Sequence, residues 1–97
     1  MGIRLDHIGI AVDDLESGSA FWQLLGLSQG DDERNDEQGV NIRFFETEQG
    51  TNATRIELLE PIGEETPIGR FLNNKGAGIQ QIAFRVDDLD SLLSRLK

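Results

Sequence analysis

The feature that most limits how this chain can fold is an internal repeat. A thirteen-residue stretch that starts at Leu5 recurs 74 residues later, starting at Ile79, with six of the thirteen positions identical. The identical positions include the run Val-Asp-Asp-Leu, which occupies residues 12–15 in one copy and 86–89 in the other. A shared run of this kind indicates duplication of a structural unit rather than a chance likeness between two junctions.

The first copy predicts a strand that leads into a helix. Residues 5–12 alternate in the manner of a strand. One predicted face carries Ile8, Ile10 and Val12, and the other carries Leu5, His7, Gly9 and Ala11. Asp13 is the predicted N-cap, with Glu16 three residues later in capping-box spacing. The helix then carries an apolar stripe and ends near a glycine; these residues are Leu15, Trp22, Leu25 and Gly26.

The second copy predicts the same plan. Its strand places Ile82, Phe84 and Val86 on the expected core face, and Asp87 is the expected cap. The helix that follows has leucines at i, i+3, i+4 and i+7, which is the spacing of an apolar helical face. These are Leu89, Leu92, Leu93 and Leu96.

At least two further strands are predicted between the copies. They run from Val40 to Phe45 and from Arg55 to Glu60, with a turn at Glu48 to Asn52. A short strand is expected near Leu27. Thr66 and Pro67 indicate a helix that ends near Gly76. The acidic run from Asp31 to Glu37 is interpreted as a solvated loop, because its carboxylates do not have the spacing of a calcium loop.

These elements predict a mixed domain of two related modules, the first reading βαββ with a further short strand near Leu27. We expect the first module at residues 1–62, a linker with a short helix at 63–77, and the start of a second module at 78–97. The second module then lacks its later strands. We therefore expect a fragment, a truncated form, or a polypeptide completed by another chain. Exposed sheet edges would favour a homo-oligomer, with a dimer as the expected form.

Composition excludes several classes of partner. The formal net charge of −9 argues against nucleic acid and against anionic membrane surfaces, which repel an acidic protein. The chain has no cysteine, so disulfides and thiolate metal ligands are excluded. No apolar run approaches the length of a membrane span, and the first residues do not look like a signal peptide. The cytoplasm is the expected location.

Three residues are candidates for a divalent metal site. His7 is the only histidine and lies mid-strand beside small residues. Glu57 lies mid-strand on the face opposite Ile56 and Leu58. Gln81 occupies the repeat position of His7 and could ligate through its amide oxygen. An imidazole with oxygen ligands suits zinc, cobalt, nickel or manganese. The alternative is a set of polar side chains on an open sheet face, and the residues alone leave both possibilities open. No catalytic acid or base can be named.

The first repeat resembles the opening of the vicinal oxygen chelate superfamily, which includes the glyoxalases. The stretch from Ile56 to Asp90 resembles the methylmalonyl-CoA epimerase branch, and Glu37 to Val40 also fits that branch. The likeness covers the whole chain and about the first two-thirds of the family domain. It implies an α+β fold of paired βαβββ modules whose sheets curve around a metal centre, with His7 and Glu57 as the first two ligands. Gln81 stands where the family usually has a histidine, and a late glutamate ligand has no counterpart here.

The resemblance implies an epimerase-like isomerase acting on a branched acyl-CoA thioester. In that chemistry a base removes the proton α to the thioester carbonyl, while a metal stabilises the enolate oxygen. One alternative is a lactoylglutathione lyase (glyoxalase I)-type isomerase, in which a metal plays the same part but the pocket is different. Another is a non-catalytic member that binds a small molecule without metal, and Gln81 in place of histidine favours it. We expect incomplete catalytic competence in this chain.

Overall fold

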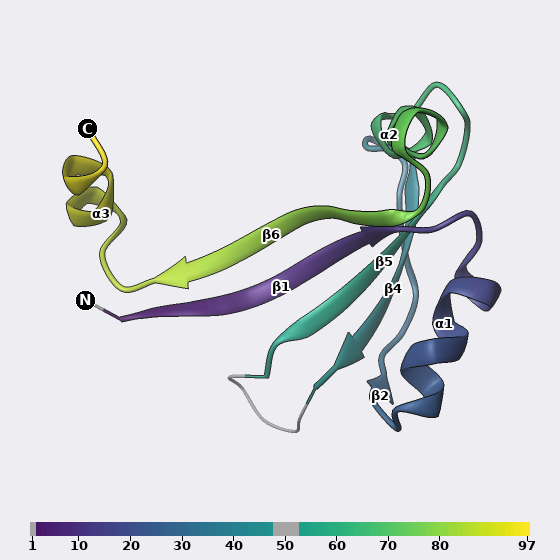
Figure 1. Ribbon diagram of the computed structural model, residues 1–97, viewed down its shortest axis with the longest axis horizontal. Coiled ribbons are helices and arrows are strands. Elements are labelled where there is room, and N and C mark those ends of the chain that lie inside the picture. Colours follow the sequence, from purple (N-terminus) through teal and green to yellow (C-terminus); the bar gives the residue numbers. More distant parts are fainter. Residues whose placement is uncertain (1, 48–52) are drawn as a thin grey trace.

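A six-stranded mixed sheet forms the centre of the protein (Figure 1). A computed structural model describes residues 2–47 and 53–97, so the predicted turn at Glu48 to Asn52 lies outside the described residues. The elements along the chain are β1 (Ile3–Ala11), α1 (Leu15–Leu24), β2 (Ser28–Gln29), β3 (Glu33–Asn35), β4 (Val40–Glu46), β5 (Arg55–Pro61), α2 (Pro67–Lys75), β6 (Gly78–Val86) and α3 (Leu89–Arg95). The predicted α+β class is confirmed.

Strand β1 lies between β5, which belongs to the first repeat unit, and β6, which begins the second repeat unit. The sheet order is β2-β4-β5-β1-β6, and β3 pairs with β4 at one side. β1 pairs with β5 in parallel and with β6 antiparallel. The two strands that carry the repeat, β1 and β6, therefore run side by side along their length, as Figure 1 shows. This pairing brings the candidate residues of both copies to one place.

Each face of the sheet is covered by a different helix. On one face, Leu15 and Trp22 of α1 pack with Phe45, Ile56 and Leu58. On the other face, α2 packs through Ile68, Phe71 and Leu72 against a second apolar cluster of Ala11, Val40, Ile42 and Leu59. The alternation predicted for β5 is confirmed, because Ile56 and Leu58 belong to the first cluster and Leu59 to the second. None of the helices in the ranges 2–47 and 53–97 is long and apolar enough to cross a membrane.

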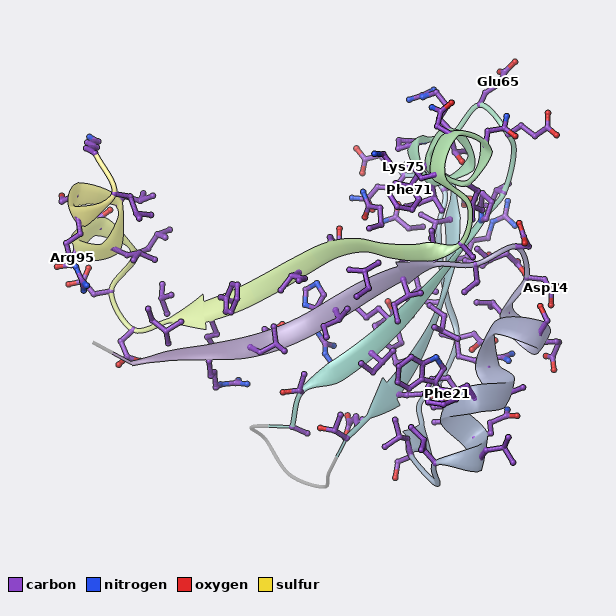
Figure 2. The ribbon with its side chains drawn as sticks, in the orientation of Figure 1. Asp14, Phe21, Glu65, Phe71, Lys75 and Arg95 are labelled. Atoms are coloured by element: carbon purple, nitrogen blue, oxygen red, sulfur yellow. The ribbon has the colours of Figure 1, made fainter. Side chains whose placement is uncertain are left out.

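The helix boundaries agree with the sequence, but two caps lie one residue later than predicted. Asp14, which is labelled in Figure 2, is the N-cap of α1 in place of Asp13. Its side chain accepts hydrogen bonds from the backbone and side chain of Ser17. Asp88, not Asp87, caps α3 in the same way through Ser91. The second aspartate of each pair has the extended backbone that an N-cap requires.

The cap predicted for α2 is confirmed. Thr66 Oγ1 accepts the backbone N–H of Gly69, and Pro67 occupies the first helical turn. The helix ends at Gly76, whose φ of 78° lies in the left-handed region that favours glycine.

Part of the predicted acidic loop is a strand. Residues 33–35 form β3 and pair with residues 40–42 of β4 through a tight connection. Gly39, with φ of 68°, and the Asn35 side chain, which accepts the backbone N–H of Gln38, shape that connection. The prediction of a loop was wrong for these residues because backbone pairing forms the strand, while Glu33 and Arg34 remain exposed. The short strand expected near Leu27 is β2.

The predicted core face of the second repeat unit is exposed. Ile82 and Phe84 are 55% and 63% exposed, and Leu89, Leu93 and Leu96 of α3 are also exposed. Figure 1 shows α3 at the far end of β6, apart from the sheet. An apolar stripe is buried only where a second layer covers it, and α3 does not fold back over β6 as α1 folds over β4 and β5. Leu25, predicted on the stripe of α1, is likewise exposed; it is the C-cap of that helix.

Candidate functional site

The three predicted metal ligands come together on the sheet face that α2 covers. His7 Nδ1 lies 3.6 Å from Glu57 Oε2. His7 Nε2 lies 3.3 Å from Gln81 Nε2, across a sequence separation of 74 residues. Glu57 is 8% exposed, which is low for a carboxylate. The parallel pairing of β1 with β5 sets Glu57 opposite Gly9, and the antiparallel pairing with β6 sets Gln81 opposite the same glycine.

Gly9 makes room for the side chain of Gln81. A Cβ atom at Gly9 would lie 2.6 Å from Gln81 Cγ, which is closer than van der Waals contact allows. The glycine therefore lets Gln81 cross the neighbouring strand and reach the His7 ring. This packing explains why a small residue follows so closely after the candidate ligand on the same strand.

Two β-bulges occur at equivalent positions of the repeat. Leu5 pairs with Phe84 and His7 with Ala83, so Asp6 is an extra residue in β1. Gly9 pairs with Gln81 and Ile10 with Ile79, so Gln80 is an extra residue in β6. Asp6 and Gln80 are separated by 74 residues, the offset of the repeat. A bulge redirects side chains and is common beside functional sites.

The bulge in β1 turns Asp6 toward the same side as His7. Asp6 Oδ2 lies 2.8 Å from His7 Nδ1. Asp6 Oδ1 accepts two hydrogen bonds from the Arg85 guanidinium, at 3.1 Å and 3.2 Å. The hydrogen bond from His7, together with Arg85 and Arg55, lowers the pKa of Asp6 from 3.8 to about 2. Asp6 is therefore an ionised acceptor at neutral pH, and Nδ1 of His7 must be the donor.

A regular strand would place Asp6 on the face opposite His7, so alternation in the sequence did not single it out. The same bulge separates Leu5 from the face of His7, because Leu5 pairs with Phe84 while His7 pairs with the adjacent Ala83. The sequence prediction that Leu5 shares the His7 face was therefore wrong.

The donor chemistry of this group fits part of a divalent metal centre. An imidazole nitrogen, a carboxylate and an amide oxygen are all ligands for zinc-like ions. Glu57 Oε2, however, lies on the Nδ1 side of the ring, 3.4 Å from Arg55 Nη2. Within the described part of the chain, no three His, Cys, Asp or Glu side chains are placed to hold a metal ion. The residues thus offer atoms of the kinds that bind such an ion, but they do not form a closed site.

A cavity of about 280 Å³ borders these residues beneath α2. Its apolar walls come from β4, β5 and the start of α2, and its polar groups are Glu57 and three glutamine amides. The lining residues are Gln38, Val40, Ile42, Glu57, Leu59, Pro67, Ile68, Gln80 and Gln81. The Oε1 atom of Gln80 is buried and has no hydrogen-bond partner among the described residues. An apolar cavity with a few convergent polar groups is the usual form of a small-molecule site.

Comparison with known proteins identifies the family. The sequence profile of the Glyoxalase/Bleomycin resistance protein/Dioxygenase superfamily matches residues 6–97. The chain belongs to this superfamily. The resemblance to vicinal oxygen chelate proteins inferred from the sequence is thereby confirmed, and its fold relatives include methylmalonyl-CoA epimerases.

Two relatives and one solved structure illustrate the likeness to those epimerases. The ethylmalonyl-CoA/methylmalonyl-CoA epimerase of Cereibacter sphaeroides is 38% identical over 96 residues, covering 97% of this chain and 69% of that protein. The mitochondrial methylmalonyl-CoA epimerase of Homo sapiens is 36% identical, with 97% and 52% covered. A variant of the Streptomyces coelicolor methylmalonyl-CoA epimerase, in complex with 2-nitronate-propionyl-CoA, is 33% identical with a TM-score of 0.81, covering 96% of this chain and 69% of that chain. Across the curated relatives that it matches, the chain spans 52% to 69% of their length.

Proposed function

We propose that this chain carries part of the active site of an epimerase-like isomerase that acts on a short branched acyl-CoA thioester. The observation that carries the proposal is that Glu57 and Gln81, from the two strands beside β1, both approach the His7 ring. The relatives named as epimerases support the same reaction class. Proton transfer α to a thioester needs stabilisation of the charge that develops on the carbonyl oxygen.

In this proposal, His7, Glu57 and Gln81 contribute ligands for a divalent cation. A divalent cation held by these residues would provide Lewis-acid polarisation of the thioester carbonyl. Glu57 would have to exchange its present contact with Arg55 for a place on the Nε2 side of His7. The candidate cations are cobalt, zinc, manganese and nickel, and the experiment described below uses Co(II).

The cavity beneath α2 is the proposed position of the acyl group. Its volume of about 280 Å³ suits a short branched chain, and Val40, Leu59 and Ile68 provide apolar walls. Glu57 and Gln81 border the cavity and also approach His7, so an acyl group inside it would have its carbonyl end beside the candidate ligands. The walls would exclude water from the carbon that loses its proton.

A second function, from another class, is favoured by one contact. Gln81 donates its amide N–H to His7 Nε2, so that hydrogen bond occupies the lone pair that a metal would need. A non-catalytic member of the superfamily could bind a small molecule in the cavity and use this hydrogen bond to fix the ring. Here the glutamine is a structural partner of His7 and not a ligand.

Exchange of the α proton for solvent deuterium separates these two functions. The chain is incubated with methylmalonyl-CoA and Co(II) in D2O, and the α position is followed by proton NMR. The epimerase proposal expects exchange faster than in the His7→Ala variant, with the exposed Gln23→Ala variant unchanged. Exchange no faster than in His7→Ala would contradict it and favour the binding function.

We also propose that two copies associate along β6 and α3. The support is the exposed apolar side chains of this region, which include Ile79, Ile82 and Phe84. Apolar surface of this kind marks association sites. Sedimentation equilibrium of the chain is expected to give a dimer mass, and Phe84→Glu is expected to give a monomer. A monomeric parent chain would contradict the proposal.

A further inference from the structure

The Asp6 carboxylate is connected to the candidate ligand more closely than any other acid at the site. Its Oδ2 atom lies 2.8 Å from His7 Nδ1, whereas Glu57 Oε2 lies 3.6 Å from the same nitrogen. The first distance is that of a hydrogen bond and the second is too long for one. Because one N–H group donates well to only one acceptor, the hydrogen bond from His7 Nδ1–H goes to Asp6 and not to Glu57.

Asp6 is itself held in place from the second repeat unit. Arg85 of β6 donates both Nε and Nη2 to Oδ1, which leaves Oδ2 for His7. The Asp6 side chain is 16% exposed, whereas the side chain of its partner Arg85 is 65% exposed. A neutral imidazole carries one proton, and a donor role for Nδ1 therefore makes Nε2 the acceptor. Gln81 Nε2 lies 3.3 Å from that atom, where it can donate.

We propose that Asp6 is a positioning residue that fixes the His7 ring in its Nδ1-protonated tautomer and presents the Nε2 lone pair toward Gln81. The bulge at Asp6 is the structural device that makes this possible, because it sets two consecutive side chains on one side of the sheet. A carboxylate behind a histidine commonly orients the ring toward a ligand in this way. The tautomer is a property of the His7 ring without any metal. The role of Asp6 can therefore fail its test while the proposed function holds, and the proposed function can fail while the tautomer is as proposed.

The test is the tautomer of His7, read by two-bond proton–nitrogen correlation NMR of the chain labelled with 15N-histidine. Since His7 is the only histidine, one ring gives the whole signal. For the neutral ring, the expected spectrum shows a protonated Nδ1 and an unprotonated Nε2. A spectrum of the Nε2-protonated tautomer in the parent chain would overturn the proposal by itself.

The Asp6→Asn variant makes the test specific. Arg85 will compete for the single amide oxygen, and the introduced amide N–H₂ will then face Nδ1, which must become an acceptor. The expected result is an exchange of the two nitrogen shifts, with the proton on Nε2, as an aspartate-to-asparagine change produces in other Asp–His pairs. The control is Asp13→Asn, an exposed aspartate beyond the other end of β1. An unchanged tautomer in Asp6→Asn, in a chain that is folded by circular dichroism, would overturn the proposal, because mere packing by Asp6 does not select a tautomer.

Discussion

Replacing Gln81 by histidine should create a tighter metal site. The side chain at position 81 already reaches the His7 ring, with 3.3 Å between Gln81 Nε2 and His7 Nε2. Gly9 beneath it has no side chain to obstruct a ring. Gln81→His therefore places a second imidazole beside the first, where the present chain has a weaker amide donor. The substitution leaves the other two candidate ligands, His7 and Glu57, unchanged in the sequence.

The expected gain follows from the strength of a complete site. Four-ligand structural zinc centres bind with roughly 10–16 kcal/mol, so one ligand contributes on the order of 3 kcal/mol. Part of this gain is lost, because an amide ligand is replaced rather than a vacant position filled. With about 1.4 kcal/mol for each factor of ten, Gln81→His should bind Co(II) roughly ten to one hundred times more tightly.

Competition against a chelator of known affinity, followed by visible absorption of Co(II), measures this gain. The matched control is Gln23→His, which adds an imidazole at an exposed position of α1. The reasoning would be refuted if Gln81→His bound Co(II) no more tightly than Gln23→His, because the side chain at position 81 would then not point at the His7 lone pair.

Three further predictions concern the residues around the site and in the core. Asp32→Ala should lower the free energy of unfolding in urea by about 1–2 kcal/mol, because the buried guanidinium of Arg43 loses a partner that accepts two hydrogen bonds but keeps Ser19 and Glu16. The control is Asp31→Ala at the exposed neighbouring position. Equal losses of stability in the two variants would contradict a stabilising role for the Asp32–Arg43 pair. Between about pH 4 and pH 2 the folded chain should lose stability as Asp6 is protonated, because the pKa of Asp6 is lowered in the folded state and the unfolded state binds the proton first. Urea titrations across this pH range should show a shallower loss of stability in Asp6→Asn. An identical pH profile in the variant and the parent chain would contradict this contribution of Asp6. Gly9→Ala should displace Gln81 and change the His7 ring signals in NMR, whereas Gly63→Ala, with open space around it, should not; unchanged signals in Gly9→Ala would contradict the close packing.

The sequence predicted the repeat units and most elements, because apolar periodicity and helix caps are local signals. It could not predict the bulge at Asp6, since strict alternation assigns adjacent residues to opposite faces and nothing in the chain marks an extra residue in a strand. The role of Glu60 was also missed, although its carboxylate accepts the backbone N–H of Leu15 and the side-chain amide of Asn41. That pairing joins residues far apart in the chain and has no local pattern.

The exposed face of β6 shows a different reason for failure. Ile82 and Phe84 have the pattern of a buried face, but burial depends on what packs over them. The three metal-ligand candidates were predicted to converge because the repeat offset relates Gln81 to His7. Their distances, and the side of the ring on which Glu57 lies, depend on side-chain geometry that a sequence pattern does not contain.

The central claim is that His7, Glu57 and Gln81 bind a divalent cation, and a Co(II) titration of this chain followed by visible absorption tests it most directly. We expect saturable binding of Co(II) that is lost in His7→Ala, weakened in Glu57→Ala and kept in Gln23→Ala. Absence of saturable binding, or binding that His7→Ala leaves unchanged, would contradict the claim.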